Sequence, residues 1–88
     1  MFTGLIEEVG KVVNIEKSFE SARLEICAKN ILQDIEIGDS IAINGVCTTV
    51  TTFSNTNFKV DLSSQTLDVT ILNEIKIGDF VNLERANL

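Results

Sequence analysis

The chain has 88 residues, of which 44% are hydrophobic and 23% charged, and this length supports one hydrophobic core but not two, so we expect a single domain over residues 1–88. Its formal net charge of −6, from 7 basic and 13 acidic residues, opposes the neutralisation of phosphates, which argues against a nucleic-acid partner and against binding to anionic membranes. The absence of histidine excludes a Ser-His-Asp or Cys-His catalytic centre made from this chain alone and any zinc site that needs histidine, and we expect no metal.

The amino-terminal third predicts two strands. Leu5–Val13 mixes apolar and charged residues as a strand does, and Gly10 is where we expect a bulge to reset the pleat. Ser21–Cys27 alternates strictly between polar and apolar residues, the pattern of a strand with one buried face. Asn14–Glu20 is polar and predicts the connection between the two strands. The segment that follows, Lys29–Asp34, allows at most one helical turn.

The middle of the chain predicts a three-stranded meander. Ser40–Ile43 and Val46–Phe53 flank Asn44-Gly45, a favoured dipeptide of type I′ hairpin turns. A second turn, at Ser54–Asn57, leads into a third strand at Phe58–Leu62. These three strands should therefore pair in chain order.

The carboxyl-terminal third predicts a short helix over Ser63–Leu72, which begins at a candidate serine cap, and a last strand at Phe80–Glu84. The approach to this strand, Ile75–Val81, repeats the earlier segment Ile35–Ile41, and both place Gly-Asp directly before a strand. Glycine relieves the backbone and aspartate bonds its own turn. The repetition therefore predicts two similar corners of a closed sheet.

Six short strands with regularly spaced turns and little helix indicate an all-β fold. An open sheet of six strands would expose two edges, whereas closure into an antiparallel barrel removes both. The residue pattern alone therefore predicts a six-stranded antiparallel barrel with a short helix.

Three blocks of the chain resemble the amino-terminal half of riboflavin synthase: the start Met1–Ile6, the central hairpin Gly38–Val50, and the end, where Gln65–Leu67 is followed by Ile77–Ala86. The resemblance covers essentially the whole chain and implies a six-stranded antiparallel Greek-key barrel with a flavin-shaped cleft. Riboflavin synthase has two such barrels in each chain, so residues 1–88 correspond to the amino-terminal, lumazine-binding repeat only.

The resemblance also implies the chemistry. Riboflavin synthase transfers a four-carbon unit between two molecules of 6,7-dimethyl-8-ribityllumazine, giving riboflavin and 5-amino-6-ribitylaminouracil, at a site shared by barrels of neighbouring subunits in a trimer. We therefore expect this chain to be the part of that transferase that binds ribityllumazine or riboflavin, with no cofactor, since riboflavin is bound as product or ligand. The isolated barrel should be inactive or only very weakly active.

The resemblance assigns nine positions to the site. Ser40 and Cys47 are the expected catalytic residues. The expected substrate-binding residues are Phe2, Thr3, Thr49, Asp61, Leu62, Ser64 and Thr66. In this arrangement Ser40, Cys47 and Thr49 face the reacting ring, while backbone groups near Leu62 and Ser64 pair with its pyrimidine edge. Thr48 stands where leucine is common in the family.

Plainer explanations exist for the same residues. An unpaired cysteine is most often a small buried hydrophobe, which would leave Cys47 without a chemical role. Ser40 and Thr49 also fit turn and strand propensity, and Asp61 also fits a solvated strand carboxylate. At the level of function, a non-catalytic binding protein similar to lumazine protein is the alternative to an enzyme domain, and a barrel that serves assembly alone is a third hypothesis.

The expected protein partners follow from the single barrel. One barrel leaves an apolar, ligand-lined face that a second copy can cover about a twofold axis, so we expect the isolated domain to form a homodimer. The resemblance implies a homotrimer for the two-barrel parent. No cationic and apolar leader follows Met1, and two cysteines do not make a disulfide framework, so we expect a cytoplasmic protein.

Overall fold

The computed structural model describes residues 4–18, 21–63 and 74–86, and these form a sheet of six strands. The strands are β1 (Glu8–Lys17), β2 (Ser21–Cys27), β3 (Ser40–Ile43), β4 (Val46–Phe53), β5 (Asn57–Ser63) and β6 (Phe80–Arg85). A single turn of 3-10 helix, η1 (Ile31–Gln33), lies between β2 and β3 in the described part of the chain. The all-β class is confirmed, whereas the helix expected over Ser63–Leu72 falls mainly on residues 64–73, outside the described residues.

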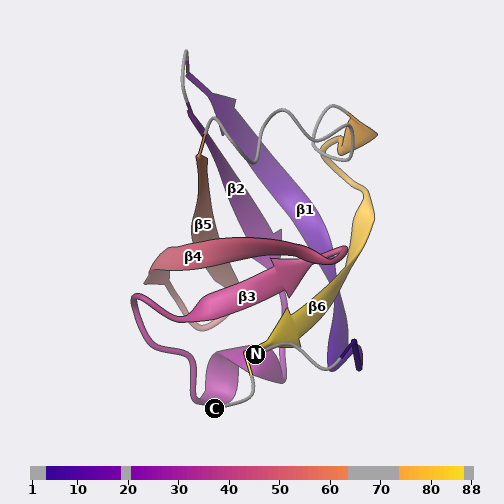
Figure 1. The fold of residues 1–88 in the computed structure, drawn as a ribbon, viewed down its shortest axis with the longest axis vertical. Helices are drawn as coiled ribbons and strands as arrows, with labels where there is room; N and C mark the ends of the chain where they lie inside the picture. The colour runs from indigo at the N-terminus through magenta and orange to yellow at the C-terminus, as the bar shows by residue number, and fades with distance from the viewer. Residues whose placement is uncertain (1–3, 19–20, 64–73, 87–88) are drawn as a thin grey trace.

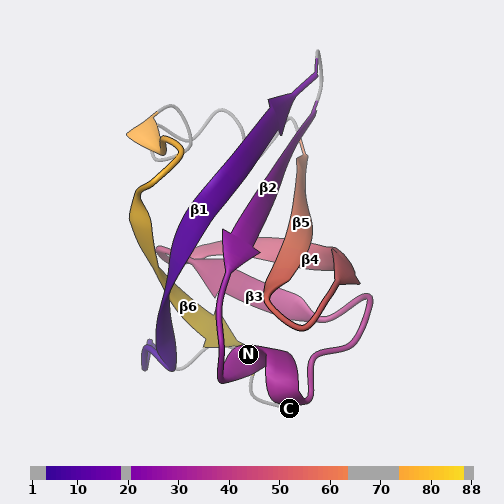
Figure 2. The same cartoon turned by 180° about the vertical axis from the view of Figure 1, so that it is seen from behind.

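All six strands pair antiparallel and close into a barrel in the order β1-β2-β5-β4-β3-β6. β3, β4 and β5 form the predicted meander, and β6 returns to lie beside β3, which makes the Greek key. β3 and β4 lie on the near side of the barrel in Figure 1, and β1, β2 and β5 lie on the near side in Figure 2. Closure gives every strand two neighbours, so the predicted barrel is confirmed.

β1 differs from its predicted extent. β2, β3 and β4 begin and end at the predicted residues, but β1 starts at Glu8 and runs on to Lys17, so the prediction that Asn14–Glu20 is a connection was wrong for residues 14–17. These residues pair with β2 at the end of the barrel where their side chains are half-buried or exposed. Strand residues outside the core are free to be polar, and this polarity made the segment read as a loop.

The bulge in β1 lies between Val12 and Asn14 and not at Gly10, where we predicted it. Gly10 pairs regularly with β6. A Cβ atom at Gly10 would lie 2.7 Å from Ile26 Cγ2 and 2.7 Å from Leu83 Cδ1. Glycine is needed at this position because β1 packs closely on the core, and the pleat is unbroken there.

The two Gly-Asp corners have the same hydrogen bonds. Gly38 and Gly78 have φ angles of +94° and +97°, and their N–H groups donate to β4 and β1 over 2.8 and 2.7 Å. Asp39 and Asp79 each accept, at 2.9 Å, the N–H of the residue three positions earlier. The predicted similarity of the corners is confirmed.

This similarity extends to the whole barrel. Exchanging β1, β2 and β3 with β4, β5 and β6 leaves the strand order unchanged. The bulge between Val12 and Asn14 has its counterpart between Val50 and Thr52. The barrel therefore consists of two similar halves, and each strand position in one half has a counterpart in the other.

Alternate residues of every strand fill the interior of the barrel. The largest fully buried side chains on the strands are Phe58, Ile26, Ile41, Ile43, Leu62, Leu83, Val12, Val50, Val60 and Val81. No helix within the described residues is long and apolar enough to cross a membrane. With the interior closed by packing, the outer face of the strands is where a ligand site can be built.

Candidate ligand-binding site

Three predicted site residues form a row across the outside of the barrel, here called the site row. Ser40 of β3 lies opposite Thr49 of β4, and Thr49 lies opposite Asp61 of β5. Directly opposed residues have Cβ atoms about 4.5–5.5 Å apart, so the three side chains are neighbours. Their strand neighbours Ile41 and Val50 point into the core, so the site row faces outward.

A second row, here called the Cys47 row, lies two residues further along these strands. Cys47 of β4 opposes Ala42 of β3, and Ala42 opposes Glu84 of β6. The Cys47 thiol is free and exposed, so the interpretation of Cys47 as a buried hydrophobe was wrong. Thr48, next to Cys47, points inward, and its hydroxyl donates to Ile41 O at 2.8 Å. This hydrogen bond satisfies the buried hydroxyl of the threonine that stands where leucine is common in the family.

The ladder between β4 and β5 ends beside these two rows. β4 pairs with β5 as far as Thr49 and Asp61, while β5 continues along β2 to Ser63 and β4 continues along β3 to Val46. Within the described residues, no strand therefore pairs with the β4-facing side of Leu62 and Ser63. The Leu62 side chain is 2% exposed and belongs to the core, so Leu62 can meet an outside ligand through its backbone.

Asp61, at the end of the site row, is held by Arg23 of β2. Arg23 Nε donates to Asp61 Oδ1 at 2.7 Å and Nη2 donates to Oδ2 at 3.3 Å, and this hydrogen bonding raises the pKa of Arg23. Both side chains are nearly half exposed, so salt screens the pair and its contribution to stability is small. Its main effect is to fix the orientation of the Asp61 carboxylate.

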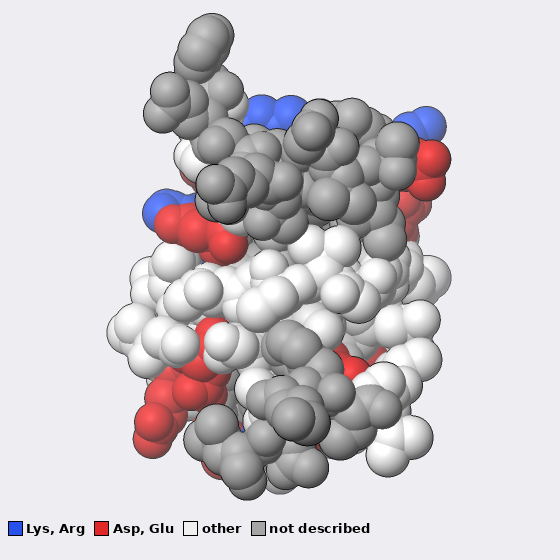
Figure 3. Space-filling view, in the orientation of Figure 1, with Lys and Arg blue, Asp and Glu red and all other residues white. Residues whose placement is uncertain are grey.

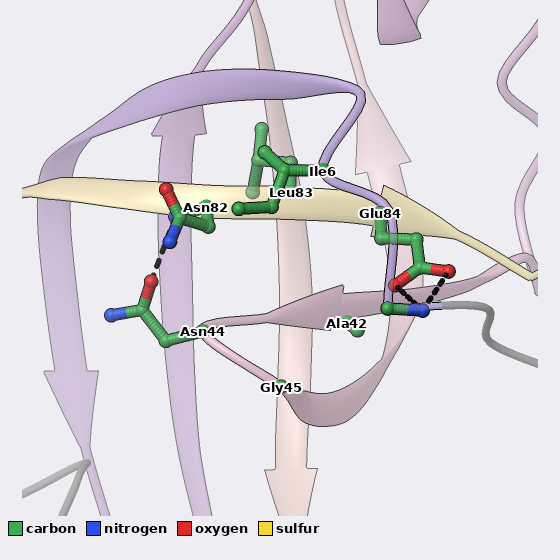
Figure 4. A pocket seen from close by; sticks show the side chains of 8 residues that line it. Ile6, Ala42, Asn44, Gly45, Asn82, Leu83 and Glu84 are labelled. Carbon is green, nitrogen blue, oxygen red and sulfur yellow. Dashed lines mark hydrogen bonds between the residues drawn. The ribbon is translucent and has the colours of Figure 1, made fainter.

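A hollow of about 270 Å³ adjoins the Cys47 row (Figure 4). The hollow is lined by Gly4, Ile6, Ala42, the β3–β4 turn and β6. Both carboxylate oxygens of Glu84 accept the Gly4 N–H at 3.1 Å. The volume is just below the range of about 300–1,000 Å³ usual for ligand pockets, so the hollow would hold part of a ligand that extends over both rows.

Four predicted site residues, Phe2, Thr3, Ser64 and Thr66, lie outside the described residues. Two buried residues that adjoin this surface in the Cys47 row, Ala42 and Glu84, were missed by sequence reasoning. A small apolar residue such as Ala42 reads as core, and no sequence signal marks it. Glu84 lies in the matched block Ile77–Ala86, which was the available signal.

The exchange of barrel halves gives the site row a counterpart, here called the counterpart row. In the counterpart row, Phe80 of β6 lies opposite Lys11 of β1, and Lys11 lies opposite Cys27 of β2. These three residues correspond in order to Ser40, Thr49 and Asp61 of the site row. The counterpart row carries an aromatic ring that is 71% exposed, an ammonium group and a thiol, and it has no hydroxyl or carboxylate. The two halves thus share a backbone and differ in chemistry, and this difference favours the site row for a polar, neutral ligand.

The face that carries β3 and β4 is uncharged at its centre. Figure 3 shows a band of neutral side chains across the middle of the described part of this face, with Asp and Glu above and below the band. With a net charge of −6 for the whole chain, the potential around the barrel disfavours anions. This charge pattern favours a neutral ligand over an anionic one.

Known proteins share both the sequence and the fold. The model of the lumazine binding domain family matches residues 3–86. Riboflavin synthases from Actinobacillus pleuropneumoniae and Bacillus subtilis (strain 168) are 55% and 46% identical over 86 residues, which is 98% of this chain and 40% of each relative. The chain thus spans about 40% of the length of the curated relatives it matches.

Two solved structures of LumP have closely similar folds. The complex with riboflavin superposes with a TM-score of 0.87 at 30% identity, over 97% of this chain and 46% of that chain. The complex with 6,7-dimethyl-8-(1'-D-ribityl) lumazine superposes with a TM-score of 0.89 at 29% identity, over 100% of this chain and 49% of that chain. With the family match over residues 3–86, these findings show that the chain belongs to the lumazine binding domain family.

Proposed function

We propose that this barrel binds 6,7-dimethyl-8-ribityllumazine or riboflavin and is the amino-terminal domain of a riboflavin synthase. Support comes from relatives of that name at 46% and 55% identity and from the LumP complexes with riboflavin and ribityllumazine. In the complete transferase, one lumazine gives a four-carbon unit to another, which yields riboflavin and 5-amino-6-ribitylaminouracil.

The observation that carries this proposal is the end of the β4–β5 ladder. The pyrimidine edge of a lumazine or flavin presents carbonyl and N–H groups in a plane, so it can pair with a free strand backbone as an added strand does. Leu62 and Ser63 offer such a backbone. Thr49, Ser40 and Cys47 place two hydroxyls and a thiol on the adjoining strands. The surface thus combines main-chain partners for the ring edge with small polar groups beside the ring.

A single barrel supplies half of the site that this reaction needs. The reaction consumes two lumazines held together, and the rate advantage comes from their mutual positioning. One barrel positions one of them, so the isolated domain should be inactive or very weakly active. Ser40 and Cys47 are the groups proposed to act on the ring bound here, and no cofactor is required because the two lumazines are themselves the donor and the acceptor.

The LumP structures favour a second candidate, a binding protein without catalysis. The two functions differ in a two-barrel protein that contains this domain. If the domain is catalytic, that protein forms riboflavin from ribityllumazine, and Cys47→Ser or Ser40→Ala lowers the rate at saturating substrate. If the domain only binds its ligand, both variants still bind it, and neither the unsubstituted two-barrel protein nor either variant forms riboflavin.

The assembly proposal concerns the barrel when it is studied by itself. We expect the isolated domain to form a homodimer, in which a second copy covers the ligand-lined face, and a two-barrel parent to form a homotrimer. A cytoplasmic location fits a biosynthetic enzyme of this kind. Neither nucleic acid nor membrane is a proposed partner.

A fluorescence titration tests the proposed ligand. Riboflavin should bind with one molecule per barrel and change its emission. Thr49→Val should weaken binding by about 0.5–1.5 kcal/mol, or roughly 2- to 10-fold, if the hydroxyl makes one net hydrogen bond. Thr52→Val is the matched control, because Thr52 is an exposed residue of the same strand beyond the bulge. Unchanged emission at high riboflavin concentration would rule the proposal out.

A further inference from the structure

The two sides of the barrel, one with the site row (the site side) and one with the counterpart row (the counterpart side), can be compared position by position. The β1–β2 ladder ends at Lys11 and Cys27, and the β4–β5 ladder ends in the same way at the site row. Lys29, two residues beyond the first end, therefore corresponds to Ser63, two residues beyond the second. The backbone at Lys29 is thus the counterpart of the backbone proposed to meet the ring edge of the ligand.

The backbone N–H groups at these two places point in corresponding directions. The Ala28 N–H donates to Thr56 O, on the β5 side, at 3.0 Å, and the N–H of Lys29, the next residue, points to the β1 side. The two Gly-Asp corners bond to β1 and β4 in matching ways, so the correspondence extends to the hydrogen bonds. The Ser63 N–H accordingly points to the β4 side, where the ligand is proposed to bind.

On the counterpart side, the carboxylate of Glu8 fills this place. One of its oxygens accepts the Lys29 N–H at 2.5 Å and the other accepts the Ile31 N–H at 2.9 Å. Hydrogen bonds from backbone N–H groups to a carboxylate are of the strong, charge-assisted kind. A heterocycle that paired with the backbone here would need the same N–H groups. Glu8 and a bound ring edge therefore exclude each other on this side.

The site side carries an apolar residue at the corresponding position. Glu8 lies opposite Leu83 of β6, and its counterpart Val46 lies opposite Ile43 of β3. Val46 is partly buried against the core, and its side chain has no hydrogen-bond acceptor. The two sides thus differ at the position from which, on one of them, a carboxylate reaches the backbone at the end of the ladder.

The rest of the counterpart side is suited to a flat ring. Phe80 of the counterpart row is 71% exposed, and an exposed aromatic ring is a stacking surface for a planar heterocycle. Without the Glu8 carboxylate, this side would offer both a stacking surface and backbone N–H groups. Glu8 is therefore the group that sets the two sides apart at the ring edge.

We propose that Glu8 is a specificity-determining residue: its carboxylate occupies the place of a ligand edge on the counterpart side, so that the barrel binds its ligand on the site side alone. This inference rests on the proposed function and explains why two similar halves give one binding site. If Glu8 only fastened the β2–η1 connection to β1, its removal would lower stability and would open no site.

The first test removes the carboxylate and follows riboflavin binding to ¹⁵N-labelled protein by NMR. In Glu8→Val, which copies the residue of the site side, riboflavin should shift the amide resonances of Cys27 and Lys29 saturably, whereas in the wild type it should leave them unchanged. Affinity at the site row should stay within about twofold of the wild type, because the two sides are separate. Glu7→Gln is the matched control, since the neighbouring Glu7 carboxylate is bonded to Arg85 and its replacement should open nothing.

The reciprocal substitution tests the same idea without altering Glu8. Val46→Glu places a carboxylate at the corresponding position of the site side, so it should move the Ser63 amide proton downfield and weaken riboflavin binding about tenfold. Val46→Gln, with a neutral acceptor of the same size, should weaken binding less, and Val46→Leu should bind like the wild type. Full affinity in Val46→Glu would overturn the inference. If Glu8→Val does not fold, this series decides.

The outcomes separate this inference from the proposed function. Wild-type protein that binds no riboflavin would overturn both together. Wild-type binding at the site row, with the Cys27 and Lys29 amides unmoved by riboflavin in a folded Glu8→Val protein, would overturn the inference alone. Saturable shifts of these two amides in the wild type would also overturn it, because they would show that the counterpart side binds ligand while Glu8 is present.

Discussion

Replacement of Gly10 by alanine tests how closely β1 packs on the core. The added Cβ would lie 2.7 Å from Ile26 Cγ2, 2.7 Å from Leu83 Cδ1 and 3.1 Å from Cys27 O. Ile26 and Leu83 are fully buried, so neither can move into solvent. Overpacking of this kind costs about 1–3 kcal/mol, and the lower entropy of the unfolded alanine chain returns about 0.4–1 kcal/mol. We expect a net loss of about 1–2 kcal/mol.

Thermal unfolding measures this loss. A domain of 60–100 residues loses about 4–8 °C in Tm for each kcal/mol, so Gly10→Ala should unfold about 5–15 °C below the wild type. Ile26→Val alone should cost about 0.5–1.5 kcal/mol, and less in the Gly10→Ala background, because the smaller side chain makes room for the Cβ. A Gly10→Ala protein as stable as the wild type would refute the close-packing argument.

Three further predictions follow. The hydrogen bond from Arg85 holds the pKa of Glu7 below its ordinary value of 4.5. The wild type should therefore be more stable than Glu7→Gln above pH 4.5, and this difference should shrink as the pH falls through the lowered pKa. Equal differences in urea midpoint between the two proteins at about pH 7 and about pH 3 would contradict this. Both cysteines are exposed, so iodoacetamide should modify both, and bound riboflavin should slow the modification of Cys47 but not of Cys27. Mass spectrometry measures the two modifications, and equal protection of both cysteines would place the ligand elsewhere. Sedimentation equilibrium should show a dimer that riboflavin strengthens, and a monomer at all concentrations would refute the assembly proposal.

Local signals in the sequence predicted the turns and corners. Asn44 and Gly45 have φ angles of +48° and +86°, the conformation that this dipeptide favours in a type I′ turn. Gly38 and Gly78 with their following aspartates form the corners for the same kind of reason, since each needs a positive φ and a side chain that bonds its own turn. Such features depend on three or four consecutive residues, so a single sequence displays them.

Features that depend on distant residues were not predictable. Gly10 was predicted to lie at a bulge because glycine within a strand often marks one. Glycine is needed there because Ile26 and Leu83 lie close to its backbone, and the sequence pattern does not show this proximity. The bond between Gly4 and Glu84 joins residues 80 positions apart. The site residues themselves came from the family resemblance, and their alignment into rows became visible from strand register.

We expect the ligand to bind on the half of the barrel that carries the site row and the Cys47 row. Titration of ¹⁵N-labelled protein with riboflavin, followed by NMR, tests it most directly, because the counterpart row has the same backbone setting and serves as an internal control. Saturable shifts should concentrate at the site row, at Cys47 and at the backbone of Leu62 and Ser63, while the resonances of the counterpart row stay unchanged. Shifts concentrated on the counterpart row, or no saturable shifts at all, would contradict it.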